Sequence, residues 1–152
     1  MVIDLPHERI RKLVAIDEEH KTVPQLFASA LEEMGELARE LKIEEKVFGN
    51  FHKKPGKDGS KGEAVDLFIC ANIVLIAHNR TPENNLWTWP PEWSGKPSVF
   101  ELLVQAAMHI THGWLLGRIA IDIFAQRGGS QEEFVETLNK KLDKWESTQK
   151  GE

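Results

Sequence analysis

The chain has 152 residues, of which 41% are hydrophobic and 28% are charged, so it is long enough for one domain with a buried core. Its net charge of −5 argues against a general binder of nucleic-acid polymers or of anionic membrane surfaces. The single cysteine, Cys70, excludes an intrachain disulfide and a thiolate metal cage. The N-terminal residues lack the apolar stretch of a signal peptide, and polar residues interrupt the longest apolar runs. We therefore expect one cytoplasmic domain over residues 1–152.

The first 41 residues predict two helices. No segment of the chain shows sustained alternation of polar and apolar residues with β-branched side chains, so the whole chain is expected to be all-α. A first helix is predicted over about 5–20, with Pro6 in its first turn. Thr22 is then expected to cap a second helix, which has Pro24 near its start and runs to about Leu41 or a little beyond.

A loop rich in glycine and lysine follows, over residues 48–62. It ends near Ser60, which is predicted to cap a third helix over about 61–79. The lysines give this loop a positive charge and the glycines give its backbone freedom, so it is a candidate for closing over phosphates; the alternative is a solvated basic loop. The candidate phosphate-binding residues are Lys53, Lys54, Lys57 and Lys61.

A long connection over residues 80–97 contains four prolines and three tryptophans. Trp87, Trp89 and Trp93 would stack on a nucleobase, lie across a subunit interface, or pack onto the protein's own surface. The sequence leaves these alternatives open. Loops of this length are usually functional or disordered, and three tryptophans argue against disorder.

A fourth helix is predicted over about 98–126, and a fifth begins after Ser130 and runs to about Ser147. Ser130 and the glutamate three residues later form a capping-box pattern. On the fourth helix, the i,i+4 spacing of Arg118 and Asp122 predicts an ion pair. His109 and His112 are either core histidines or, less strongly indicated, ligands of a transition metal.

The third and fourth predicted helices are hydrophobic on nearly every side. Such helices are normally buried all round, and five helices in one subunit can hardly cover two of them. We therefore expect a homo-oligomer, a dimer or a tetramer. Gly113 and Gly117, four residues apart, would allow the close approach of another helix either from a partner subunit or from the same chain.

Acidic residues stand at the edge of apolar faces on two successive helices. On the second helix, Glu33, Glu36 and Glu40 form a stripe beside the apolar face. On the third, Glu63 and Asp66 share a face with apolar side chains. Carboxylates three residues apart repel each other, and burial strengthens that repulsion. A divalent cation such as Mg²⁺ or Mn²⁺ would resolve both problems, whereas the alternative is that these are solvated acidic pairs.

The acidic motifs resemble those of a known superfamily. The segment EEMGE (32–36) is followed, after 26 residues, by EAVD (63–66). This arrangement is similar to the E-E-x-x-E … E-x-x-D pattern of the all-α nucleoside triphosphate pyrophosphohydrolases, which include MazG-like proteins, dimeric dUTPases and phosphoribosyl-ATP pyrophosphatases. The segments GELAREL and NKKLDKW also look like MazG-like members.

The resemblance implies a single MazG-like domain whose four-helix-bundle core is completed by homo-oligomerisation. It implies Mg²⁺-dependent cleavage of (d)NTPs between the α- and β-phosphates, giving a nucleoside monophosphate and pyrophosphate, as in nucleotide-pool house-cleaning. By position, the metal ligands would be Glu33, Glu36, Glu63 and Asp66, and Glu32 would orient or deprotonate the attacking water.

Other functions remain open. A dUTPase or a phosphoribosyl-ATP pyrophosphatase would carry the same motifs, and the base preference depends on loops that the motifs do not describe. A non-catalytic helical-bundle interaction protein would keep the fold without binding a metal. A di-iron carboxylate bundle ranks last, because such bundles use E-x-x-H motifs and the chain contains none.

Overall fold

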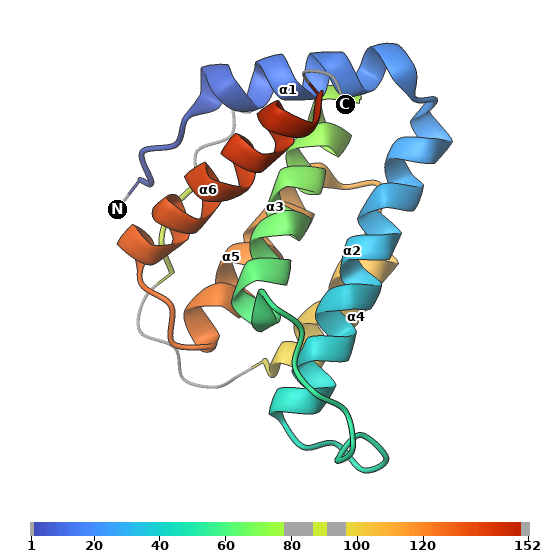
Figure 1. Cartoon of the computed structure of the whole chain (residues 1–152), viewed down its shortest axis with the longest axis vertical. Helices are drawn as coiled ribbons and strands as arrows, with labels where there is room; N and C mark the ends of the chain where they lie inside the picture. The colour runs from blue at the N-terminus through green and yellow to red at the C-terminus, as the bar shows by residue number, and fades with distance from the viewer. Residues whose placement is uncertain (1, 78–86, 91–96, 150–152) are drawn as a thin grey trace.

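The computed structural model describes residues 2–77, 87–90 and 97–149 of the chain (Figure 1). Within these ranges the chain forms six helices, one more than predicted, and one isolated bridge between Val2 and Thr88. The all-α prediction is confirmed for this part of the chain. The helices are α1 (His7–His20), α2 (Val23–Glu44), α3 (Gly59–Ala77), α4 (Val99–Met108), α5 (Gly113–Gln126) and α6 (Gln131–Gln149).

Helix α3 lies at the centre of the fold. It packs against α1, α2, α5 and α6, and Figure 1 shows it (green) between α2 and α6, with α1 across its end and α5 behind it. The apolar side chains of α3 between Ala64 and Leu75 are at most 2% exposed. One chain by itself therefore buries these apolar side chains, and their hydrophobicity is no argument for a partner subunit.

Two of the predicted helix caps are observed in the structure. The Thr22 hydroxyl accepts the Gln25 N–H at 3.4 Å, so Thr22 caps α2 as predicted. The Ser130 hydroxyl likewise accepts the N–H of Glu133 at the start of α6. Pro6 precedes α1 instead of lying inside its first turn.

Ser60 does not cap α3, contrary to the prediction. The helix begins at Gly59, two residues before the predicted start, so Ser60 lies inside it. The Ser60 N–H and hydroxyl both donate to the Glu44 carboxylate of α2, at 3.0 and 2.6 Å. A side chain from another helix thus supplies the acceptor that the sequence assigned to Ser60 itself.

The prediction of a single helix over 98–126 is also wrong, because residues 109–112 separate α4 from α5. His109 is the C-cap residue of α4. His112 is the N-cap residue of α5, and its Nδ1 atom accepts the Leu115 N–H at 3.2 Å. Both histidines are exposed, so neither is a core residue. The break lets α4 pack against α2 while α5 packs against α3. Two separate packing surfaces therefore replace one long helix.

Gly113 and Gly117 serve a crossing within the chain. A Cβ added at Gly113 would lie 2.7 Å from the Ala71 carbonyl oxygen and 2.7 Å from Leu75 Cγ, both on α3. A Cβ at Gly117 would lie 2.3 Å from the ring of Trp87. The two glycines therefore let α3 and the Trp87 ring approach α5 closely, which settles the alternative left open by the sequence.

We expect Gly113→Ala to lower the free energy of unfolding by about 2 kcal/mol, because its methyl group would overlap backbone atoms of α3 that cannot move aside cheaply. Thermal unfolding would then shift down by about 5 °C. Gly35→Ala is the matched control: Gly35 lies on α2 with nothing within 4 Å of the new Cβ, so alanine should stabilise slightly. Equal stability of G113A and the wild type would contradict the close crossing.

Of the tryptophans in the long connection, Trp87 lies in the core and Trp89 packs against it. The Trp87 ring is buried, stacks on Trp114 at 6.2 Å between ring centres, and meets Phe68 edge-on. Trp89 packs edge-on against the Phe124 and Phe134 rings. Of the three alternatives for these two residues, packing within the protein is the one observed, and Trp93 lies outside the described residues.

The segment that carries Trp87 is anchored to α5 and to the N-terminus. Arg118 forms the predicted ion pair with Asp122, at 2.6 Å, and also donates to the Thr88 carbonyl oxygen. The Ile3 N–H donates to the Trp87 carbonyl oxygen at 2.8 Å. These contacts explain how a chain segment outside the helices reaches the core.

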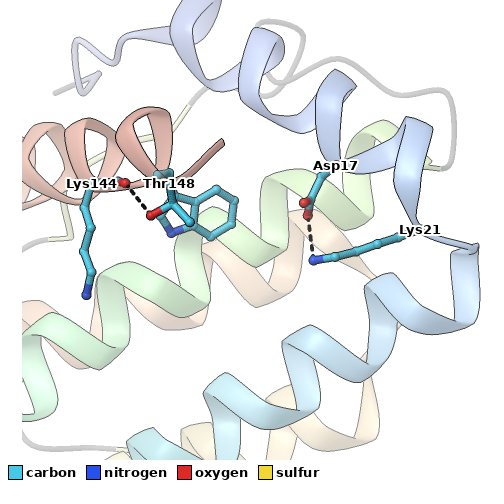
Figure 2. Close-up of a pocket in the computed structure, with 5 residues that line it drawn as sticks. Asp17, Lys21, Lys144 and Thr148 are labelled. Atoms are coloured by element: carbon cyan, nitrogen blue, oxygen red, sulfur yellow. Dashed lines mark hydrogen bonds and ion pairs between the residues drawn. The ribbon is translucent and has the colours of Figure 1, made fainter. Parts of the chain in front are cut away.

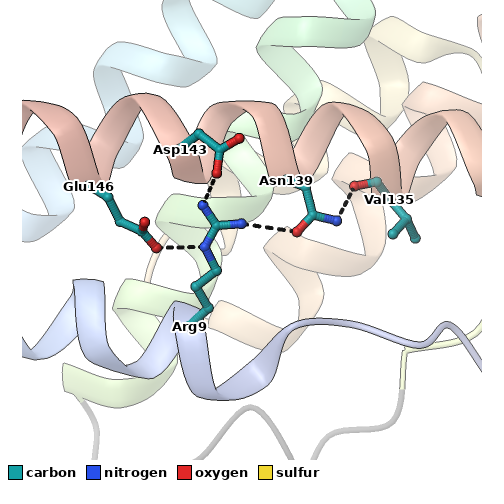
Figure 3. A network of polar contacts seen from close by, with 5 residues as sticks. All are labelled: Arg9, Val135, Asn139, Asp143 and Glu146. Carbon is teal, nitrogen blue, oxygen red and sulfur yellow. Dashed lines mark hydrogen bonds and ion pairs between the residues drawn. The ribbon is translucent and has the colours of Figure 1, made fainter.

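Helix α1 is held to α6 by one arginine (Figure 3). The Arg9 guanidinium donates to Glu146 Oε1 at 2.6 Å, to Asn139 Oδ1 at 3.1 Å and to the Asp143 carboxylate. These three acceptors lie along one face of α6, while Phe134, Leu138 and Leu142 of the same helix are buried in the core. Helix α6 is therefore held by α1 on one side and by the hydrophobic core on the other.

No helix in the described part of the chain is both long enough and apolar enough to cross a membrane. The neighbouring helices α2 and α4 expose large apolar side chains, among them Leu31 (55%), Val104 (59%) and Met108 (74%).

Candidate metal centre

Two groups of carboxylates meet where α2 faces the first turns of α3. The oxygens of Glu33, Glu36 and Glu63 lie within 4.8 Å of one another, and so do those of Asp58, Glu63 and Asp66. Glu63 belongs to both groups. The four residues predicted as metal ligands are thus brought together by the packing of α2 on α3, and Asp58, just before α3, joins them.

The local sequence explains why these side chains are near each other. Met34 and Leu37 of α2 are buried, so Glu33 and Glu36 lie at the edge of the same apolar face. All four carboxylates named in the paired motifs stand one helical turn from a partner, and the close contact between α2 and α3 brings the two pairs together.

Two of the carboxylate oxygens are buried and unsatisfied. Glu33 Oε2 and Glu63 Oε2 are inaccessible to solvent and have no hydrogen-bond partner. An unpaired buried carboxylate oxygen costs free energy, and several close together also repel one another. A bound divalent cation would remove both costs, because carboxylate oxygens are the ligands that Mg²⁺ and Mn²⁺ prefer. The residues present therefore fit such an ion.

The pKa values reflect the same crowding. Burial raises the pKa of Glu33 to about 8, and neighbouring carboxylates, Asp66 first among them, add to the shift. Burial and the charge of Asp66 raise the pKa of Glu63 to about 7. Burial also raises the pKa of Asp66, although Lys141 opposes that shift. Without a cation, the centre therefore holds protons near neutral pH, and cation binding would release them.

Lys141 of α6 is the basic residue of this centre, and sequence reasoning did not single it out. Its Nζ atom lies 2.7 Å from Asp66 Oδ2 and 2.7 Å from Asp58 Oδ2. Burial acts to lower the pKa of Lys141, but the bonds to Asp58 and Asp66 outweigh it and raise the pKa. The available signal was its position three residues after Leu138, at the margin of the buried face of α6.

Glu32, the predicted catalytic residue, is exposed on α2 and belongs to neither carboxylate group. It is close enough for its charge to act on Glu33. Glu32 is thus an exposed neighbour of Glu33, and its catalytic role stays a prediction.

The lysine-rich loop is fastened to the end of α2. Glu40 Oε1 accepts the Gly56 N–H and a hydrogen bond from Arg39, both at 2.8 Å, while Glu44 holds Ser60 as described above. Glu40, the third member of the acidic stripe, therefore positions this loop instead of joining the carboxylate groups.

The four candidate phosphate-binding lysines are not equivalent. Lys54 and Lys57 are exposed and Lys53 is partly exposed. The Lys61 Nζ atom instead donates to Glu133 Oε1 of α6 at 2.5 Å and lies 6.0 Å from the centre of the Phe124 ring. Lys61 would have to leave Glu133 to reach a phosphate.

A pocket of about 270 Å³ lies between the ends of α1 and α6 (Figure 2). On one side, Asp17 of α1 forms an ion pair at 3.2 Å with Lys21, the residue that follows this helix; Lys144, Trp145 and Thr148 of α6 line the other side. Lys144 lies one helical turn beyond Lys141, and its charge acts on Asp58 and Asp66. The pocket therefore neighbours the carboxylate centre along α6.

Comparisons of the chain with models of protein families, with curated proteins and with solved structures find no match. The likeness to the pyrophosphohydrolase superfamily thus depends on the motif residues of the sequence alone.

Proposed function

We propose that the chain is a Mg²⁺-dependent nucleoside triphosphate pyrophosphohydrolase that converts (d)NTPs to nucleoside monophosphates and pyrophosphate. The observation that supports this proposal best is the pair of carboxylate groups sharing Glu63, in which buried oxygens of Glu33 and Glu63 have no partner. Glu40 also has a buried oxygen without a partner, but it pairs with Arg39, whereas no described ion pair joins Glu33 or Glu63 to a basic side chain. These oxygens are therefore left for a cation to bind.

In this proposal the ligand set consists of Glu33, Glu36, Glu63 and Asp66, with Asp58 as a further candidate that the structure adds. When bound, Mg²⁺ would neutralise phosphate oxygens and favour ionisation of a bound water. Glu32 is assigned the task of orienting this water and accepting its proton, since its exposed carboxylate lies beside the centre.

The remaining substrate contacts follow from the charges around the centre. Lys53, Lys54 and Lys57 are assigned to the phosphates, because they are partly or fully exposed on a loop that Glu40 fixes to α2. The pocket beside Trp145 is the described cavity best placed for the nucleoside end, since an indole ring offers a surface for a base.

We also propose that the protein acts as a homo-oligomer. Leu31, Val104 and Met108 support this proposal, because exposed apolar side chains on neighbouring helices mark a surface that a second copy of the chain would cover. The hydrophobicity of α3 does not support it, since its apolar side chains from Ala64 to Leu75 are buried within one chain. Sedimentation equilibrium of the purified protein measures this directly, and a monomer at micromolar concentration would contradict it.

The test of the function is product analysis with a panel of NTPs and dNTPs, with and without Mg²⁺. We expect Mg²⁺-dependent formation of a nucleoside monophosphate and pyrophosphate in equal amounts. Release of single phosphates would contradict cleavage between the α- and β-phosphates. Absence of turnover together with absence of Mn²⁺ binding in calorimetry would instead favour a non-catalytic interaction protein.

A further inference from the structure

The two carboxylate groups differ in how their negative charge is balanced. In the group formed by Glu33, Glu36 and Glu63, buried oxygens of two members lack a hydrogen-bond partner. In the group formed by Asp58, Glu63 and Asp66, both aspartates bind the ammonium of Lys141 at 2.7 Å. The Glu33–Glu36–Glu63 group is thus open to a metal cation, while the aspartates of the other group already bind the Lys141 ammonium.

The Lys141 ammonium is well held in this position. The Lys141 side chain is only 12% exposed, and the next residue, Leu142, is buried in the core. Arg9 ties the opposite side of α6 to α1 through three acceptors. With the backbone of α6 held in this way, a rotation of the lysine side chain would take the ammonium away from Asp58 and Asp66.

We propose that Lys141 is a built-in competitor for divalent cations: it occupies the Asp58–Asp66 group, so that the first cation enters at Glu33, Glu36 and Glu63. A second cation binds only when the Lys141 ammonium leaves the two aspartates. This inference deepens the proposed function and depends on its metal centre. It assigns Lys141 as a residue that orders metal binding, and it makes the second cation bind more weakly than the first.

The physical reason is electrostatic. A divalent cation between Asp58 and Asp66 would stand within a few ångströms of a lysine ammonium, and like charges at that distance repel strongly in a partly buried site. The cation must also replace two charge-assisted hydrogen bonds. Both effects act chiefly on the Asp58–Asp66 group. On the other group Lys141 acts only through its charge on the shared Glu63, because no described hydrogen bond or ion pair joins it to Glu33 or Glu36.

The experiment is a calorimetric titration of the metal-free protein with Mn²⁺, supported by the electron paramagnetic resonance signal of free Mn²⁺. In the wild type we expect one tighter and one weaker binding event. Lys141→Met removes the charge while keeping the length of the side chain, so the second event should tighten by about tenfold or more, with little change in the first.

Lys140→Met is the matched control. Lys140 is the neighbouring residue on α6, it is exposed and pairs with Glu136, and its replacement should leave both binding events unchanged. Lys141→Gln provides a second neutral variant that retains hydrogen-bond donors, in case the methionine variant does not fold. Lys141→Arg keeps the charge and should keep the weak second event.

The possible results distinguish a failure of this inference from a failure of the proposed function. A wild type that binds no Mn²⁺ would overturn the metal centre and the inference with it. A wild type that binds Mn²⁺, with neutral Lys141 variants that bind it equally or more weakly, would overturn the inference alone and leave the proposed function standing.

Discussion

Replacing Glu63 with glutamine should abolish divalent-cation binding and reduce pyrophosphate release by about 100-fold or more. Glu63 is the residue that both carboxylate groups share, so its loss weakens both positions at once. Residues that merely orient metal ligands already cost about 10- to 100-fold when they are replaced. A ligand shared by two groups is expected to cost at least as much as the upper end of that range.

The measurement is Mn²⁺ calorimetry together with turnover of the best substrate from the panel. Glu136→Gln is the matched control, because it is the same substitution at an exposed position of α6, where Glu136 pairs with Lys140. Circular dichroism establishes that each variant is folded. If folded E63Q binds Mn²⁺ and turns over substrate like the wild type, the metal centre does not lie at these carboxylates.

Replacing Glu33 with glutamine should stabilise the metal-free protein at pH 8 by about 2 kcal/mol, or about 5 °C in thermal unfolding. Burial and the neighbouring carboxylates raise the pKa of Glu33 from 4.5 to about 8 in the folded state. The conversion at about 1.4 kcal/mol per pKa unit gives an upper limit, which screening by solvent at this partly exposed side chain reduces.

The sign of the pH dependence follows from the raised pKa. Above about pH 4.5 the unfolded chain loses the Glu33 proton while the folded protein retains it, so this residue lowers the stability of the fold progressively up to about pH 8. Glutamine does not ionise. The advantage of E33Q over the wild type should therefore be small at pH 4.5, grow through neutral pH and level off above about pH 8.

Added Mg²⁺ should reverse the order of stability. The wild type gains stability by binding the cation in its folded state alone, whereas E33Q has lost a ligand and gains less. The measurement is thermal unfolding of both proteins between pH 4.5 and 8.5, with a chelator and with Mg²⁺, and with E136Q as the control. If E33Q is less stable than the wild type at pH 8 in the presence of a chelator, the Glu33 carboxylate stabilises the fold by itself and is not a strained metal ligand.

Local spacing in the sequence was enough to predict much of the fold. The apolar periodicity gives the helices, and hydroxyl groups at Thr22 and Ser130 mark two of their starts. Arg118 and Asp122 pair because residues four apart meet on a helix surface. Each of these features depends on atoms within one or two helical turns, which is the range over which a sequence pattern specifies geometry.

The candidate centre was predictable only in part. The spacing of the carboxylates on α2 and α3 identified four residues that the fold does bring together. Asp58 and Lys141 were not identified, because their membership depends on where the start of α3 and the middle of α6 come to lie. Lys61 was expected near phosphates, yet it pairs with Glu133 on α6. A basic residue next to a loop has several partners within reach, and only packing selects one.

The sequence by itself determined the helical class, the starts of α2 and α6 and the two acidic pairs, since periodicity, capping and i,i+3 spacing are local properties. The tertiary structure alone decided the break between α4 and α5, the burial of α3 within one chain and the contact of Gly113 with Ala71. It also decided the approach of Lys141 to Asp66 across 75 positions of the chain. The physical reason is that such contacts depend on which hydrophobic faces cover each other, and many arrangements of amphipathic helices share the same local pattern.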